Sequence, residues 1–94
     1  MTTVLTPRQR QALKGQAHAL EPVVTVGHAG LTPGVVREID GALAAHELIK
    51  VRVGGDDRAA RAALLDDICA QTGALAVGSV GKILILWRER PADD

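Results

Sequence analysis

Residues 23–34 read VVTVGHAGLTPG, and two glycines separated by two residues lie in the middle of this stretch. Gly27 and Gly30 follow a short β-branched run and precede Thr32-Pro33, a pair that is typical of a helix start. Glycine adopts positive φ and lets another backbone come close. Such a loop before a helix also directs N–H groups outward, where phosphate is a common ligand. The stretch predicts either a phosphate-contacting loop or a tight strand-to-helix connection.

The letters GHAG exclude two other phosphate motifs. Residue 29 is Ala, so the G-x-G-x-x-G fingerprint of dinucleotide sites is absent. The GK[ST] ending of a P-loop is absent as well. A GxxG loop between an apolar strand and a helix is how KH domains hold a nucleic-acid backbone. The spacing is therefore compatible with backbone-led binding of nucleic acid, and the tight connection remains the alternative.

Candidate metal ligands and nucleophiles form no recognisable pattern. His18, His28 and His46 are the three histidines, and no cysteine or carboxylate accompanies them at ligand spacing. We interpret His28 as a hydrogen-bond donor or stacking group for nucleic acid. Cys69 is the only cysteine and lies in a helical pattern, which predicts a small apolar packing role. Ser79 has no nucleophile motif around it. We expect no catalysis, no metal and no cofactor.

The charge is unevenly distributed. The 94 residues carry 11 basic and 11 acidic side chains, so the formal net charge is zero. Residues 1–37 nevertheless hold four basic side chains and one acidic one. This asymmetry predicts an electropositive N-terminal third, where Lys14 in the first helix is a candidate phosphate contact. The alternatives are a chance bias in a small protein and an ordinary solvated helix face.

A second group of basic residues follows from the segment LIKVRV at 48–53. Its alternation places Lys50 and Arg52 on one face of a strand. If no helix covers this face, the two side chains form a basic strip; if one does, Leu48 is buried and the long side chains reach past it. Lys82 in a turn and Arg88 on the last strand would extend the strip.

The chain is expected to contain three helices and four strands. We expect helices from Thr6-Pro7, from Thr32-Pro33 to His46 and from Asp56 or Asp57 to about Thr72, and strands within 23–26, 48–53, 74–80 and 82–88. The order α-β-α-β-α-β-β predicts a two-layer α/β fold with a mixed four-stranded sheet, parallel across the strand-helix-strand units and antiparallel in the last hairpin. We expect residues 1–94 to form one domain with a disordered tail at 91–94.

Aromatic residues are almost absent, because Trp87 stands alone without Phe or Tyr. The core must therefore consist of Val, Ile, Leu and Ala, while Trp87 either packs in it or stacks on a base. The N-terminus has no signal-peptide core, and the apolar run at 83–87 is too short to span a bilayer. A cytoplasmic location is expected.

Several short sequences occur together in an order that is more specific than any of them singly. They are Leu13-Lys14-Gly15, Ala17-His18, Pro22, the GxxG loop, Leu31-Thr32, His46-Glu47-Leu48-Ile49-Lys50-Val51, Thr72-Gly73 and Gly81-Lys82-Ile83-Leu84 through Leu86-Trp87-Arg88. Over roughly residues 5–90 the chain resembles the CRM domain (chloroplast RNA splicing and ribosome maturation) in its single-domain bacterial YhbY-type form. The resemblance implies a fold similar to the C-terminal domain of bacterial translation initiation factor three, and RNA binding. Bacterial single-domain members associate with precursors of the large ribosomal subunit, and plant members use the module in intron splicing.

The resemblance also implies where RNA binds. The family's GxxG loop is assigned to RNA contact, and its basic positions match Lys14 and Lys50. Together with the residues singled out above, the predicted RNA-binding set is Lys14, Gly15, His18, Gly27, His28, Ala29, Gly30, Lys50, Arg52, Lys82 and Arg88. The chain departs from the family in its neutral charge and in having His28 and Ala29 where polar or basic residues are common, which lowers the expected electrostatic affinity.

We therefore expect an RNA-binding protein that assists assembly of the large ribosomal subunit, with ribosomal RNA as its partner. The alternative is a small protein-interaction domain that a protein partner recruits to the ribosome. A contiguous basic surface would favour the first, and an exposed apolar sheet face would favour the second.

Overall fold

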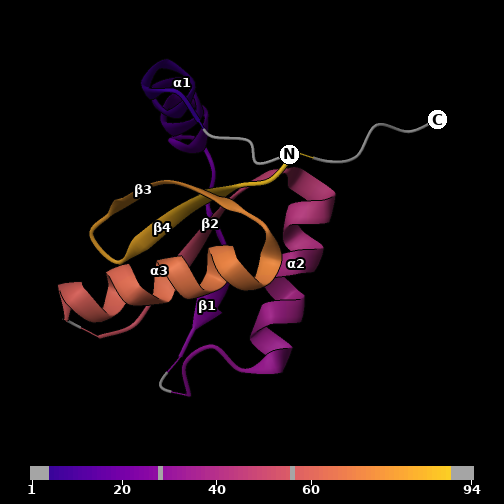
Figure 1. The fold of residues 1–94 in the computed structure, drawn as a ribbon, viewed down its shortest axis with the longest axis vertical. Helices are drawn as coiled ribbons and strands as arrows, with labels where there is room; N and C mark the ends of the chain where they lie inside the picture. The colour runs from indigo at the N-terminus through magenta and orange to yellow at the C-terminus, as the bar shows by residue number, and fades with distance from the viewer. Residues whose placement is uncertain (1–4, 28, 56, 90–94) are drawn as a thin grey trace.

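The computed structural model describes residues 5–27, 29–55 and 57–89. Its elements are α1 (Pro7–Ala17), β1 (Pro22–Val26), α2 (Pro33–His46), β2 (Leu48–Val53), α3 (Arg58–Thr72), β3 (Leu75–Val80) and β4 (Ile83–Trp87), as Figure 1 shows. The expected order α-β-α-β-α-β-β is confirmed. The tail at 91–94 lies outside the described residues, and no helix within them is long and apolar enough to cross a membrane.

The helices begin where the side chains predict. Thr6 and Gln9 form a reciprocal capping box, in which the Thr6 hydroxyl accepts from the Gln9 backbone N–H at 3.1 Å and the Gln9 side-chain oxygen Oε1 accepts from the Thr6 N–H at 2.9 Å. The Thr32 hydroxyl accepts from the Val35 N–H at 3.2 Å at the start of α2. Of the two aspartates considered for α3, Asp57 is the N-cap. These contacts span three residues or fewer, which is why the sequence reveals them.

The four strands form one mixed sheet in the order β1-β2-β4-β3. β1 and β2 are parallel, and β4 is antiparallel to both β2 and β3. Cα pairings run across the sheet from Thr25 to Arg52, from Arg52 to Ile83 and from Ile83 to Val80. This row lies near the ends at which the parallel strands β1 and β2 finish, and it adjoins the loop that contains the two glycines.

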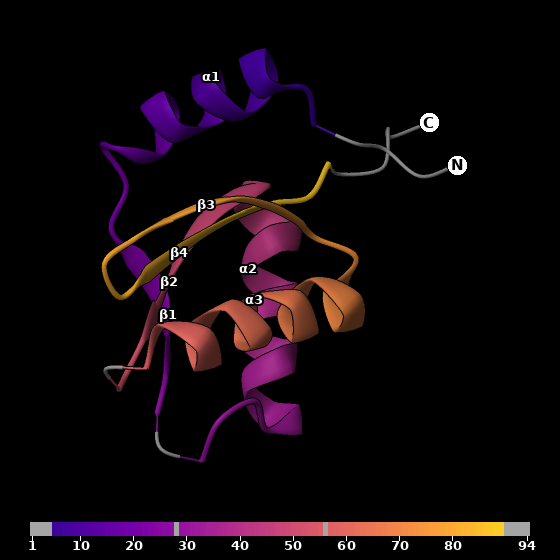
Figure 2. The same cartoon turned by 60° about the vertical axis from the view of Figure 1, so that its left-hand side comes forward.

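Helices cover both faces of the sheet, which Figure 2 shows with α1 on one side and α2 and α3 on the other. The main core under α2 and α3 consists of Val24, Val26, Ile39, Leu43, Ile49, Val51, Val53, Ile68, Ala74, Leu84 and Leu86. A smaller core under α1 consists of Leu5, Ala17, Leu48, Val77 and Ile85. The prediction of two layers is corrected to three, because consecutive residues Leu48 and Ile49 point to opposite faces and both are buried.

α1 covers only part of its face of the sheet. Ala17 is its only buried residue, and Leu13 packs against the smaller core from a half-buried position. Along β2, Leu48 is buried beneath α1, Lys50 is half-buried and Arg52 is exposed. The sheet face is therefore closed at the start of β2 and open at its end.

Candidate nucleic-acid interface

The described residues of the predicted glycine loop lie at the surface. Gly27 and Ala29 are exposed and Gly30 is half-buried, while His28 lies outside the described residues. Gly30 has a φ of 73°, and its N–H donates to the Gly27 carbonyl at 3.0 Å, so the loop is a tight turn. Nothing lies within 4 Å of where a Cβ would stand on either glycine. Both glycines thus leave open space beside the backbone.

Much of the hydrogen-bonding capacity beside this loop is used internally. The Thr32 N–H donates to the Gly30 carbonyl at 3.0 Å, and the Val35 N–H donates to the Thr32 hydroxyl. Pro33, the first residue of α2, has no N–H to offer. A ligand can therefore approach the backbone of the loop closely, but it finds few free N–H groups there to bind.

A hollow of about 830 Å³ opens beside the loop, at the ends where β1 and β2 finish. We call it the glycine hollow, because Gly27, Gly30, Gly54 and Gly55 all line it. The two glycine segments lie side by side, since the Gly54 N–H donates to the Val26 carbonyl at 3.3 Å. Backbone from two loops therefore borders one cavity.

Cationic side chains predominate around the glycine hollow. Arg52, Lys82 and Arg61 line it, and Asp57 is the carboxylate among its described lining residues. One oxygen of Asp57, Oδ1, accepts from the N–H groups of Ala59 and Ala60 at 2.9 and 3.2 Å, so this charge is engaged at the start of α3. The described lining residues therefore carry more positive than negative charge, unlike the neutral chain as a whole.

The hollow brings together predicted residues from distant parts of the chain. Arg52 from β2 and Lys82 from the β3–β4 turn meet the glycine loop there. The Val53 N–H donates to the Lys82 carbonyl at 2.8 Å, which fixes the turn beside the end of β2. The sequence reasoning missed Arg61, because it lies on α3 and only the packing of α3 beside Gly55 places it at the hollow. Its Nη1 donates to the Gly55 carbonyl at 3.3 Å.

A basic strip connects this hollow with α1. Lys50 and Arg52 lie on the α1-facing side of β2, where Leu48 is buried and Arg52 is open. Lys50 reaches past the covered end and donates through Nζ to the Leu20 carbonyl at 3.0 Å. Lys14 lies over β3, because its Cε would be 2.5 Å from a Cβ built on Gly78. We call Lys14, Lys50 and Arg52 the basic strip.

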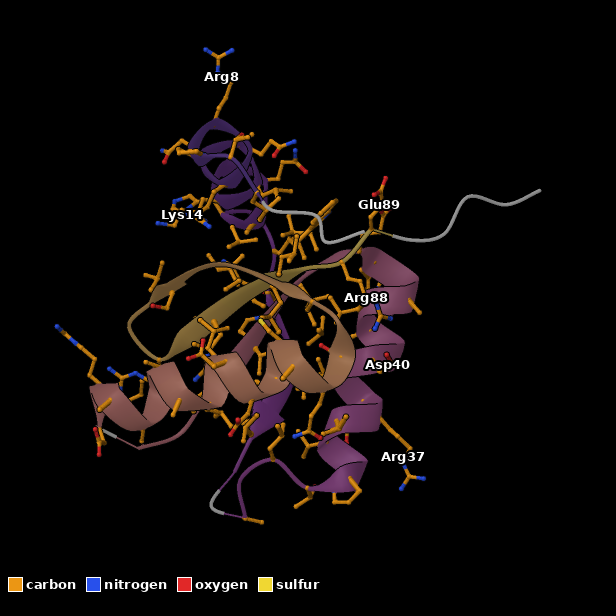
Figure 3. The ribbon with its side chains drawn as sticks, viewed as in Figure 1. Arg8, Lys14, Arg37, Asp40, Arg88 and Glu89 are labelled. Carbon is orange, nitrogen blue, oxygen red and sulfur yellow. The ribbon has the colours of Figure 1, made fainter. Side chains whose placement is uncertain are left out.

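The structure separates the predicted α1 residues from the glycine loop. Figure 1 shows α1 at one end of the molecule and the β1–α2 loop at the other. Gly15 lies on α1 and His18 is its C-cap, and both are exposed at that end. In Figure 3, Lys14 lies on the sheet side of α1, whereas Arg8 and Arg37 point away from the body of the protein.

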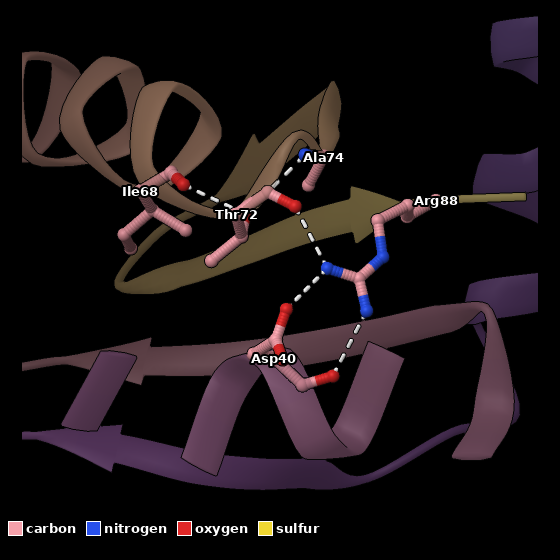
Figure 4. A network of polar contacts seen from close by, with 5 residues as sticks. All are labelled: Asp40, Ile68, Thr72, Ala74 and Arg88. Carbon is pink, nitrogen blue, oxygen red and sulfur yellow. Dashed lines mark hydrogen bonds and ion pairs between the residues drawn. The ribbon is translucent and has the colours of Figure 1, made fainter. Parts of the chain in front are cut away.

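Arg88, predicted to extend the basic strip, instead joins α2 to α3. Its Nη1 donates to the Asp40 carboxylate and, at 2.7 Å, to the Thr72 carbonyl, while Nη2 donates to the Asp40 carbonyl at 3.0 Å (Figure 4). Trp87 beside it packs against the smaller core on the α1 face. Both side chains therefore have packing roles in the structure.

Two further candidates from the sequence, a metal site and the Cys69 thiol, can be assessed within the described residues. No group of three histidine, cysteine or carboxylate side chains within the described residues is placed to hold a metal ion. Burial raises the pKa of the Cys69 thiol, and the nearby Asp66 carboxylate adds to the increase. A thiol with a raised pKa is a poor nucleophile at neutral pH, so Cys69 packs rather than reacts.

Comparison with known proteins identifies the family. Residues 5–88 match the model of the CRS1 / YhbY (CRM) domain. The chain belongs to the CRM family. The match spans all seven elements, from the residue before the α1 cap to Arg88 after β4.

Relatives of this CRM domain are named for RNA binding. An RNA-binding protein of Haemophilus influenzae is 49% identical over 86 residues, covering 92% of this chain and 87% of that protein. A protein of Pseudomonas aeruginosa, named a probable RNA-binding protein, is 44% identical over 87 residues, covering 93% and 84%. The solution structure of a hypothetical Staphylococcus aureus protein, proposed to bind RNA, superposes with a TM-score of 0.85 at 26% identity, covering 97% of this chain and 95% of that one.

Proposed function

We propose that this CRM domain binds ribosomal RNA in precursors of the large ribosomal subunit and assists their assembly without catalysing a reaction. The observation that carries the proposal is the exposed backbone of Gly27 and Ala29 beside a hollow lined by Arg52, Arg61 and Lys82. The names of its relatives support RNA as the partner. The proposal places the protein in the cytoplasm, with the ribosome.

Contact with RNA would be led by the backbone. The open space at Gly27 and Gly30 lets a sugar-phosphate strand approach the main chain closely. Arg52 neutralises phosphate at the hollow, and Lys50 and Lys14 continue the positive charge across the sheet toward α1. Because phosphate contacts carry no sequence information, we expect the domain to recognise RNA mainly by shape.

The proposal is tested by adding one negative charge to the loop. Gly27→Asp suits this test better than a change at Gly30, because Gly27 has open space and no positive φ. We expect affinity for a large-subunit ribosomal RNA transcript to fall about fivefold to tenfold, since one like charge near phosphate costs about 1 kcal/mol or more. Filter binding or fluorescence anisotropy measures the change.

Gly41→Asp is the matched control. It adds the same charge at an exposed position of α2 with nothing within 4 Å of the new Cβ. We expect it to leave affinity close to that of the unchanged protein. For about four phosphates neutralised, a plot of log affinity against log salt should have a slope of about −3 to −4. Equal affinity of the two aspartate variants would remove the loop from the mechanism.

A protein-interaction domain is the second candidate, and exposed apolar side chains favour it. Leu20, Val23 and Val80 are 38%, 50% and 65% exposed, and the first two line a separate hollow of about 440 Å³ near the end of α1. A flat salt response, together with ribosome association that survives Gly27→Asp, would support recruitment by a protein partner.

A further inference from the structure

We propose that the glycine hollow holds one unpaired nucleotide of the bound RNA, with the base inside and its phosphate at the cationic rim. This inference rests on the proposed RNA-binding function and adds which part of the RNA is recognised. The hollow measures about 830 Å³. That volume lies within the range of small-ligand pockets, which is about 300–1,000 Å³.

The walls of the hollow suit a base more than a phosphate. Apolar side chains make up a large part of them: Val26, Val53, Ala60, Leu64 and Ile83. Val26 and Val53 are buried members of the main core, so their contribution is a firm floor. Ala60 is exposed and has a short side chain, which leaves room above that floor. A phosphate gains nothing from such a surface, whereas the flat face of a base does.

The rim supplies the charge that such a nucleotide needs. Arg61 is half-buried, and the bond from its Nη1 to the Gly55 carbonyl holds the guanidinium at the rim. A guanidinium has five N–H donors, so most remain for a phosphate. The Arg52 side chain is exposed and makes no hydrogen bond or ion pair to another described residue. The glycine backbone then borders the strand on either side of the inserted base.

An unpaired nucleotide is the RNA element that fits this arrangement. A pocket cannot reach a base inside an A-form duplex. Extruding a paired base costs the free energy of unpairing and unstacking it, and this cost is smaller for a bulged base, which has no pairing partner. Trp87 packs on the α1 face of the sheet, so the base meets aliphatic groups instead of an aromatic ring. We therefore expect tolerance of base identity and a preference for a bulge or loop.

The test compares two RNA hairpins of identical stem, one fully paired and one with a single bulged adenosine. The unchanged protein should bind the bulged hairpin about tenfold more tightly, because only an unpaired base can bury its face against the apolar walls. Ala60→Met fills the hollow from an exposed helix position, and Met is nearly as good a helix former as Ala. It should abolish the preference, so that the variant binds both hairpins with the same affinity.

Ala63→Met is the matched control, because Ala63 is exposed on the same helix and does not line the hollow. It should retain the full preference, and Arg61→Gln should weaken binding of the bulged hairpin more than of the paired one. Replacing the bulged base by 2-aminopurine gives a second readout, since its fluorescence should change with the unchanged protein and not with Ala60→Met. Equal affinity for both hairpins, or a preference that survives Ala60→Met, would overturn the pocket and leave RNA binding intact. Failure to bind either hairpin or the ribosomal transcript would overturn both proposals.

Discussion

Replacing Arg88 by Met separates a packing role for this side chain from a role in RNA binding. Methionine preserves much of the aliphatic stem and removes the guanidinium, which bonds α2 at Asp40 and the C-terminal carbonyl of α3 at Thr72. The two hydrogen bonds to backbone carbonyls contribute the larger part of the stabilising free energy, because the donor in each is charged. The pair with the Asp40 carboxylate contributes less, since the Asp40 side chain is 59% exposed and solvent screens it.

The expected cost follows from these contacts. Each of the two carbonyl bonds contributes about 1–1.5 kcal/mol here, and the exposed pair adds less than about 1 kcal/mol, so Arg88→Met should lower the free energy of unfolding by about 2–4 kcal/mol. For a domain of this size that corresponds to a fall in Tm of about 8–20 °C. Thermal unfolding followed by circular dichroism measures the fall, and Trp87 fluorescence gives a second probe on the α1 face.

Asp40→Ala is the control for this experiment. It removes the carboxylate and leaves both carbonyl bonds, so the expected loss is less than about 1 kcal/mol. RNA affinity, measured well below the Tm of each variant, should be unchanged in both. A loss in Asp40→Ala as large as in Arg88→Met would refute the division between carbonyl and carboxylate bonds. If Arg88→Met left the Tm unchanged and weakened RNA binding, Arg88 would contact RNA and would not act mainly in packing.

Two further predictions concern local energetics. Thr6→Ala removes the capping box of α1, and we expect it to lower the free energy of unfolding, measured in urea, by about 1 kcal/mol. A decrease smaller than the error of that measurement would show that the smaller core alone holds α1. Burial raises the pKa of Cys69 in the folded state, so the thiol of the unfolded chain loses its proton first as the pH rises. The contribution of Cys69 to stability is therefore complete below the ordinary thiol pKa and decreases progressively above it. The free energy of unfolding should therefore fall between about pH 8 and 10 by more in the unchanged protein than in Cys69→Ala, and parallel profiles would contradict the shift.

The sequence by itself determined the elements and their order, because the signals involved are local. Thr6, Thr32 and Asp57 cap helices through bonds to residues two or three positions away, and Gly73 ends α3 at a φ of 76°. The alternation in residues 48–53 identified the faces of β2 without any knowledge of its neighbours. The same local reading located the exposed glycine loop.

Only the tertiary structure decided which faces are covered and which residues meet. The two-layer prediction failed because α1 crosses to the opposite face, although adjacent apolar residues Leu48 and Ile49 carried a signal for it. Arg88 finds its partners 48 and 16 residues away, and Arg61 reaches the hollow through the packing of α3. Such placements depend on strand order and helix docking, which are set by the summed burial of many side chains. A stretch of a few residues cannot encode them, so the set of side chains around the candidate site emerges only from the folded chain.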